Sequence, residues 1–253
     1  EHIVSLIMYT ELIFIPFFFA FFLTRLGTIP KKKNMRDSQV IRDIISVIKQ
    51  GENVGIFPEG VRTWSGATSP MDASIGKLIK LLKVPVVVPI MKGMNLMHPR
   101  WSYHIRPYPM EVEYKLLFSK EEVAALGYQE LFEKLSEGMK HDEVDFQRSR
   151  MGKIKSNKRA EYISHALYLC PECQAVDSFR ANGNDFHCQD CSYGIHINSF
   201  GFFEQLGKGK LHFDNIRDWF DWEEKTFVKF IRDKYILQEE APLFKDQNMK
   251  IFK

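Results

Sequence analysis

The residues best suited to chemistry lie in the stretch Phe57-Pro58-Glu59-Gly60-Val61-Arg62-Thr63, which closes a short apolar run. Pro58 lacks the N–H that a central strand needs, so we expect a strand over 54–57 to stop there. The following loop offers the Glu59 carboxylate, a flexible Gly60 and the forked guanidinium of Arg62. Exposed backbone N–H groups beside such a guanidinium form a seat for a phosphate. By themselves these residues would also fit a tight turn that carries a surface ion pair.

All four cysteines of the chain form two Cys-x-x-Cys pairs, Cys170/Cys173 and Cys188/Cys191, with fourteen residues between them. Each pair forms a knuckle that directs two thiolates at one point, and two knuckles complete a tetrahedral zinc site. A turn signal at 182–184, Asn-Gly-Asn, predicts a hairpin between the pairs, as in a zinc ribbon. Two disulfides and a redox dithiol are the competing interpretations, although the doubled motif argues against a single redox pair.

The charges of this ribbon argue against nucleic acid as a partner. Arg180 is the one Lys or Arg between the two cysteine pairs, and three aspartates lie in the same region. The ribbon therefore lacks the basic footprint of a nucleic-acid-binding module, and we expect structural use of the metal. His187 and His196 lie nearby, but four thiolates already complete the site, so we expect both to be bystanders.

Two further segments accompany the first loop. Gly27-Thr28-Ile29-Pro30-Lys31-Lys32-Lys33 is a turn that leads into three lysines, and 84–90 is an apolar run with two prolines. In order and spacing, these segments and the Phe-Pro-Glu-Gly-x-Arg loop resemble the glycerolipid acyltransferase family, whose best-known members acylate lysophosphatidic acid. Lys33 stands where the family usually has Arg, and Thr63 where it usually has Ser. The resemblance covers roughly residues 7–140 and includes Tyr9-Thr10-Glu11-Leu12.

This resemblance implies transfer of a fatty acyl group from a thioester of coenzyme A or acyl carrier protein to lysophosphatidic acid, in phospholipid biosynthesis. It assigns acceptor binding to Glu59, Gly60, Arg62, Thr63 and Lys33. Glycerol 3-phosphate or another lysophospholipid would fit the same seat. A non-catalytic scaffold, whose zinc ribbon recruits a partner, is the alternative from a different class.

The family's catalytic motif is His-x-x-x-x-Asp, and none of the eight histidines here has Asp five positions later. We expect the motif to lie upstream of Glu1, so no catalytic residue is assigned and the 253 residues alone are expected to be inactive. A degenerate, non-catalytic family member is the other interpretation.

Net charge is only +3, but basic residues cluster in two places that suit phosphate or an anionic lipid surface. The clusters are Lys31, Lys32, Lys33 and Arg36, and Arg148, Arg150, Lys153, Lys155, Lys158 and Arg159. A solvated linker is an equal alternative for the second cluster. The apolar segment 4–23 has the length of a membrane span, but Glu11 and Pro16 interrupt it.

The resemblance instead implies that segment 4–23 is an apolar helix lying against the membrane. We therefore expect monotopic or peripheral attachment at the cytoplasmic face, with the membrane surface, lysophospholipid and acyl carrier protein as partners. Disulfides are disfavoured in such a compartment.

Strands alternate with helices along the first half of the chain, which predicts an α/β fold with a mostly parallel sheet flanked by helices, plus a small zinc ribbon. Apolar residues at helical spacing predict a helix that Gly51 ends, and Ser74 is a candidate cap for a second helix. Strands are predicted over 85–90 and 111–118, and a helix from Ser119 to about Lys140.

The predicted domains are an acyltransferase domain at 1–145, a basic linker with a short helix at 146–169, the zinc ribbon at 170–197 and an aromatic-rich α+β region at 198–253. In that last region, aromatic residues between 213 and 231 recur at helical spacing. We interpret them as core, with a lipid-facing surface as the alternative. A strand is predicted to begin at 249–252.

Overall fold

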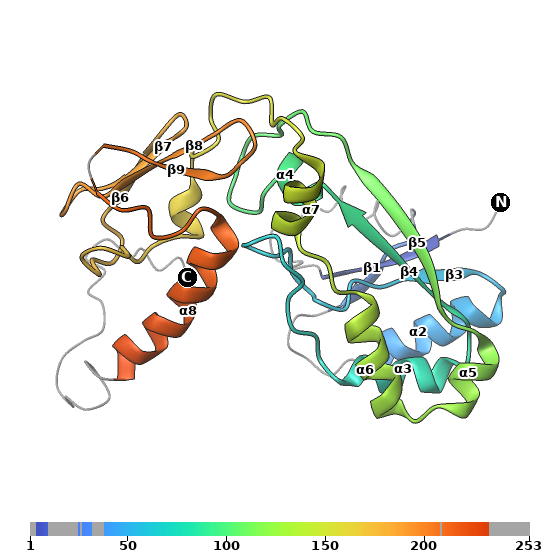
Figure 1. The fold of residues 1–253 in the computed structure, drawn as a ribbon. Helices are drawn as coiled ribbons and strands as arrows, with labels where there is room; N and C mark the ends of the chain where they lie inside the picture. The colour runs from blue at the N-terminus through green and yellow to red at the C-terminus, as the bar shows by residue number, and fades with distance from the viewer. Residues whose placement is uncertain (1–3, 10–24, 26, 32–37, 208, 233–253) are drawn as a thin grey trace, which may run out of the picture. The chain divides into compact units, whose positions relative to one another are not determined.

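The computed structural model describes residues 4–9, 25, 27–31, 38–207 and 209–232 (Figure 1). They form two compact units, each assembled from several stretches of chain. The first unit comprises 1–62, 68–90 and 112–141, and the second comprises 63–67, 91–111 and 142–253. The boundaries of the four domains predicted from the sequence stay predictions.

Three short parallel strands form the first sheet of the first unit. β1 (Val4–Tyr9) lies between β2 (Ile29–Lys31) and β3 (Asn53–Gly55) and pairs in parallel with both. Parallel neighbours need a crossover connection, and α2 (Ser38–Lys49) supplies it between β2 and β3. Gly51 follows α2 with a φ of 82°, which ends the helix as predicted.

The core beneath this sheet is formed by the apolar face of α2. The buried members are Ile29, Val40 and Ile44, with Val47, Ile48, Val54, Ile56, Leu78 and Leu82 packed around them. Of the apolar residues at helical spacing in 40–48, those at 40, 44, 47 and 48 belong to this core, whereas Ile41 is exposed.

A second sheet of the first unit consists of β4 (Val86–Lys92) and β5 (Glu111–Phe118), whose last and first residues extend into the second unit. Three helices pack with it: α3 (Ser74–Leu82), α5 (Lys120–Ala125) and α6 (Tyr128–Gly138). Their shared core is Ile79, Val88, Ile90, Phe118, Val123, Leu131 and Leu135. The described elements thus form a mixed α/β fold, with parallel pairing between β1 and its two neighbours.

The sequence placed several boundaries of the first unit inexactly. The helix predicted from Ser119 starts as expected, with a capping box between Ser119 and Glu122, but it divides at Gly127, where the backbone is extended. Ser74 is not a cap; Ala73 holds that position, and the Asp72 carboxylate accepts the Ser74 N–H at 2.7 Å. β3 ends at Gly55, two residues before the end of the strand predicted over 54–57, because the chain turns at Pro58.

The apolar segment 4–23 was predicted to be a helix, and this is wrong for its first six residues, which form β1. Residues 10–23 lie outside the described residues, as does the strand predicted at 249–252. Among the helices that the structure describes, none is both long and apolar enough to cross a membrane.

The second unit contains a four-stranded antiparallel sheet in the order β6-β7-β8-β9. Its strands are β6 (Phe179–Asn182), β7 (Asp185–Cys188), β8 (Gly194–Ile197) and β9 (Phe203–Gln205). The β6–β7 hairpin turns at Gly183, which has a φ of 61°, as the Asn-Gly-Asn signal predicted. The unit also contains α4 (Met94–Met97), α7 (Glu143–Arg150), the 3₁₀ helix η1 (Ile163–His165) and α8 (Ile216–Ile231).

One hydrophobic core joins this sheet to α8. Figure 1 shows the ribbon of both elements. Trp219 of α8 is fully buried and its indole meets five aromatic rings, those of Phe179, Phe186, Tyr193, Phe203 and Phe213. The aromatic residues after the ribbon are therefore core, as predicted. They complete the ribbon instead of forming a separate body.

The predicted basic linker, 146–169, contains the end of one helix and a short 3₁₀ helix. Residues 146–150 lie within α7, where Arg148 pairs with Asp214 at 3.1 Å and Arg150 with Glu111 at 2.9 Å. Arg159 is buried, and its guanidinium donates to the carbonyl of Ile197 at 2.9 Å. These three cations are thus engaged within the second unit, whereas Lys153 and Lys155 of the same cluster are exposed.

Candidate functional site

The loop after β3 begins with a tight turn. The Gly60 N–H donates to the carbonyl of Phe57 at 3.1 Å, which closes a β-turn with Pro58 and Glu59 at its centre. Gly60 has a φ of 70°, a conformation that glycine adopts without strain. Residues 57–60 thus form the tight turn that was the alternative interpretation of this stretch, and the prediction of a phosphate seat beside it stays a prediction.

Glu59 fixes this loop from within. Its Oε2 accepts the backbone N–H of Ser69 at 2.7 Å, so the carboxylate ties the turn to a segment ten residues further along. Burial raises the pKa of Glu59 above its usual value, and the hydrogen bonds from Ser69 act in the opposite direction. Sequence inspection did not identify Ser69, because nothing in its neighbourhood marks it as a partner.

The remaining predicted acceptor-binding residues are found in different surroundings. Arg62 is exposed on the loop of the first unit, whereas Thr63 belongs to the second unit, where its Oγ1 accepts the Gly66 N–H at 3.2 Å. Lys33 lies outside the described residues. Two apolar side chains flank the turn and are exposed, Phe57 by 50% and Val61 by 42%.

Parallel pairing brings two of the sequence motifs to one edge of the first sheet. β2 ends at Lys31, level with Tyr9 of β1, and β3 ends at Gly55, level with Leu6. Because β1 alone separates β2 from β3, these two strands lie about 10 Å apart across the sheet. Ligands of open α/β sheets bind at this carboxyl edge.

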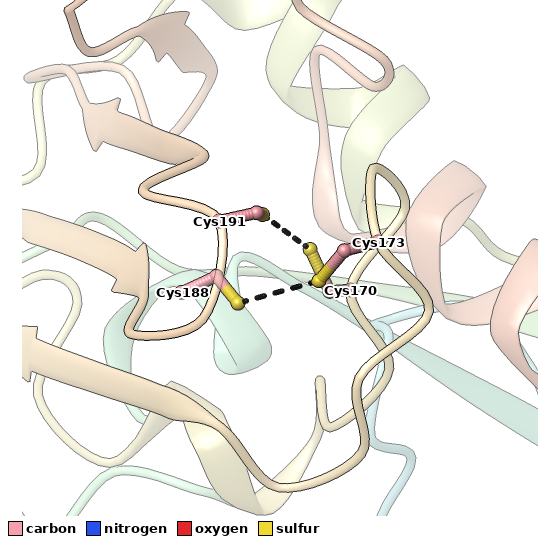
Figure 2. A group of neighbouring side chains, drawn as sticks. All are labelled: Cys170, Cys173, Cys188 and Cys191. Carbon is pink, nitrogen blue, oxygen red and sulfur yellow. Dashed lines mark hydrogen bonds between the residues drawn. The ribbon is translucent and has the colours of Figure 1, made fainter.

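The second candidate site is the cysteine cluster. All four Sγ atoms lie within 4.8 Å of one another, and Figure 2 shows the side chains of the two knuckles directed at one point. The Cys170–Cys191 and Cys173–Cys188 Sγ separations are 3.6 and 3.8 Å. A disulfide would require about 2.05 Å. Tetrahedral zinc with Zn–S bonds of about 2.3 Å places its sulfurs about 3.8 Å apart, so the geometry fits four-coordinate metal.

The surroundings of the first knuckle suit a bound cation. Burial raises the pKa of the Cys170 thiol, while the backbone N–H groups of Cys173 and Glu172 lower it. N–H groups aimed at a sulfur favour the thiolate, and a coordinated cation favours it far more. Cys170 and Cys188 are buried and Cys173 is exposed, so the site lies at the surface of the unit.

The histidines near the cluster are engaged elsewhere. His196 contacts the Asp185 carboxylate at 2.6 Å through Nδ1, and among the described residues the candidate metal group consists of the four cysteines alone. His212 contacts Glu172, inside the first knuckle, at 2.6 Å through Nε2. Among the described residues, neither His187 nor His196 is part of the candidate metal group, and their role as bystanders stays a prediction.

Two residues of α8 that sequence reasoning missed hold the chain just before Cys170. Glu223 is fully buried and accepts backbone N–H groups of Tyr168 and Leu169, and the Trp219 indole N–H donates to the Leu169 carbonyl at 3.2 Å. Burial raises the pKa of Glu223 to about 8. A signal was present, because an acid four residues after Trp219 lies on the apolar face of a predicted helix.

Comparisons with known proteins bear on the first of these two sites. Residues 1–92 match the family model described as Acyltransferase, a range that includes the 57–63 loop and both flanking motifs. No curated protein and no solved structure matches the chain. The match supports acyl transfer as the general activity, and it covers the N-terminal part of the chain, where the motifs that resemble glycerolipid acyltransferases lie.

Proposed function

We propose that this chain is part of a phospholipid-biosynthesis acyltransferase that moves a fatty acyl group from a coenzyme A or acyl carrier protein thioester to lysophosphatidic acid. The observation that carries the proposal is the 57–63 loop, which leaves the carboxyl edge of a parallel sheet with an exposed Arg62. The family match over residues 1–92 supports acyl transfer, and the choice of acceptor rests on the chemistry of this loop.

Within this proposal the residues of the loop have different roles. Arg62 supplies a planar, permanently charged fork that suits two-pronged recognition of a phosphate. Glu59 is already bonded to Ser69, so it braces the loop and leaves the anion to Arg62. Gly60 permits the turn, while Thr63 and Lys33 add a hydroxyl and a charge to the acceptor site. Exposed Phe57 and Val61 would face the acyl chains of a membrane surface.

The reaction needs a general base that these residues do not supply. In the family, a His oriented by an Asp removes the proton of the acceptor hydroxyl. The alkoxide oxygen attacks the thioester carbonyl, a new ester C–O bond forms, the C–S bond breaks, and the thiol of the donor leaves with a proton. The 253 residues contain no His-x-x-x-x-Asp, so the test below measures acceptor binding and does not depend on turnover.

We further propose that the cysteine cluster holds one zinc ion with a structural role. Cys170, Cys173, Cys188 and Cys191 would be its ligands, and four thiolates leave no open coordination position for catalysis. The metal would link the two knuckles of a ribbon whose core includes α8.

The acceptor site is tested by binding of a short-chain lysophosphatidic acid to the whole chain, with Arg62→Ala, Arg62→Lys and the control Arg42→Ala. Arg42 is also exposed and also in the first unit, on α2. Loss of a charge-assisted contact of about 1.5–3 kcal/mol weakens binding roughly ten- to a hundredfold. Arg62→Lys should recover part of it, and Arg42→Ala should match wild type.

An unchanged affinity for Arg62→Ala, together with a lowered melting point, would show that Arg62 serves stability instead. Equal binding of glycerol 3-phosphate would shift the acceptor to that molecule. Failure of the wild-type chain to bind any of the phosphate-bearing acceptors would favour a non-catalytic scaffold.

A further inference from the structure

The segment that leads into the first cysteine knuckle is held by side chains of α8. Oε1 of Glu223 accepts the backbone N–H of Tyr168 at 2.6 Å and also that of Leu169. Nε1 of Trp219, one turn earlier on the same face, donates to the carbonyl of Leu169 at 3.2 Å. Both polar backbone groups of Leu169, the residue before Cys170, are therefore bonded to α8.

The other side of the same segment is held by the knuckle itself. Leu169 forms a bridge with Val176, the Cys170 N–H donates to the Ala175 carbonyl at 2.9 Å, and the Asp177 N–H donates to the Tyr168 carbonyl at 2.8 Å. With partners on both sides, the backbone at 168–170 has little freedom to rotate. The direction in which Cys170 presents its sulfur thus depends on contacts from α8.

The chemistry of Glu223 separates it from an ordinary core residue. Its side chain has no exposed surface, and its Oε2 has no hydrogen-bond partner among the described residues. An unpaired buried carboxyl oxygen is costly, whereas an apolar side chain would fill the space without that cost. What Glu223 gains in return is that its other oxygen accepts two successive backbone N–H groups, which an apolar side chain could not do.

We infer that Glu223 and Trp219 are positioning residues for the metal site, so that metal binding at the four cysteines and docking of α8 stabilise each other. The inference rests on the proposed zinc site and adds that the affinity of that site is set partly from α8. Groups that orient metal ligands typically change metal affinity ten- to a hundredfold when they are altered. Linkage requires the reverse effect of equal size, which is that metal strengthens the docking of α8.

The test measures zinc affinity of the whole chain by competition with a chromophoric chelator, and ligand geometry from the absorption spectrum of the cobalt-substituted protein. Glu223→Ala should weaken zinc binding about ten- to a hundredfold. Glu223→Gln should lose less, because its amide oxygen still accepts, and Trp219→Phe should lose a few-fold while keeping the ring packing. Glu224→Ala, an exposed neighbour on α8, is the matched control and should bind as wild type does.

A second readout distinguishes positioning from general stabilisation. Hydrogen exchange at 168–169 and along α8 should rise together when zinc is removed, and less so in Glu223→Gln than in wild type. Wild-type zinc affinity in both Glu223→Gln and Trp219→Phe would overturn the inference even if Glu223→Ala fails to fold. A wild-type chain that binds no zinc would overturn the metal site itself, which is a different result.

Discussion

Replacing Cys173 by Ser separates the stabilisation that the proposed metal provides from the stabilisation that side-chain packing provides. Cys173 is exposed, whereas Cys170 is completely buried, so Cys173→Ser removes a ligand without burying a hydroxyl or opening a cavity. Metal that binds only the folded ribbon stabilises it by about 4 kcal/mol when free zinc is a thousandfold above its Kd. For a unit of this size, roughly 3–4 °C per kcal/mol gives a melting shift on the order of 10–15 °C.

The assay is a thermal melt of the second unit's aromatic signal, with zinc and with chelator, beside elemental analysis of protein purified without added metal. Wild type should contain about one zinc per chain and lose the shift in chelator, and Cys173→Ser in zinc should melt close to chelated wild type. Gln189→Ser, an exposed change inside the second knuckle, is the control and should keep the shift. Metal-free wild type with disulfide-linked cysteines, or full zinc stabilisation of Cys173→Ser, would refute the reasoning.

Two further predictions concern the first unit. Burial raises the pKa of Glu59, so the charged form of this side chain opposes folding. The contribution of protonated Glu59 to the free energy of unfolding is complete below the usual glutamate pKa of about 4.3. It is lost as the pH rises through the pKa of Glu59 in the folded protein. Glu59→Gln keeps an acceptor for Ser69 and should melt no lower than wild type at pH 7, with the difference closing towards pH 4; a clear loss at pH 7 would contradict this. A Cβ on Gly76 would lie 2.3 Å from the Tyr128 carbonyl oxygen, so Gly76→Ala should cost about 1–3 kcal/mol in urea unfolding. Gly127→Ala meets no atom within 4 Å and should change stability by less than about 1 kcal/mol, and equal effects at both positions would contradict the packing argument.

How much of the fold the sequence predicts depends on how local the determining signal is. The capping box at Ser119 and the Asn-Gly turn at 182–184 involve residues within three positions of one another, and both form as predicted. The break at Gly127 and the early end of β3 depend on how helices and strands pack, which periodicity does not report. The strand at 4–9 was mistaken for a helix because a mostly apolar run fits a parallel strand as well as a lipid-facing helix.

The metal site shows the same contrast within a few residues. Its four candidate ligands can be identified from Cys-x-x-Cys spacing alone, because each knuckle is a local structure. The groups that hold the first knuckle in place come from α8, with Glu223 more than fifty residues after Cys170. Only the tertiary packing around Trp219 reveals that an acid on an apolar helix face has a task there.

The contacts of the basic residues at 148–159 bear on where the proposed acceptor site lies. In the sequence, the cluster at 148–159 is as good a phosphate site as any other, yet Arg148 and Arg150 pair with carboxylates from distant segments, and Arg159 is buried against backbone carbonyls. A cation committed to a protein carboxylate must break that pair before it can bind a phosphate, which lowers the net gain. Arg62 differs from these three residues in its place, because it follows the turn after β3, at the carboxyl edge of the parallel strands. Binding of lysophosphatidic acid should therefore be insensitive to Arg148→Ala while it responds to Arg62→Ala.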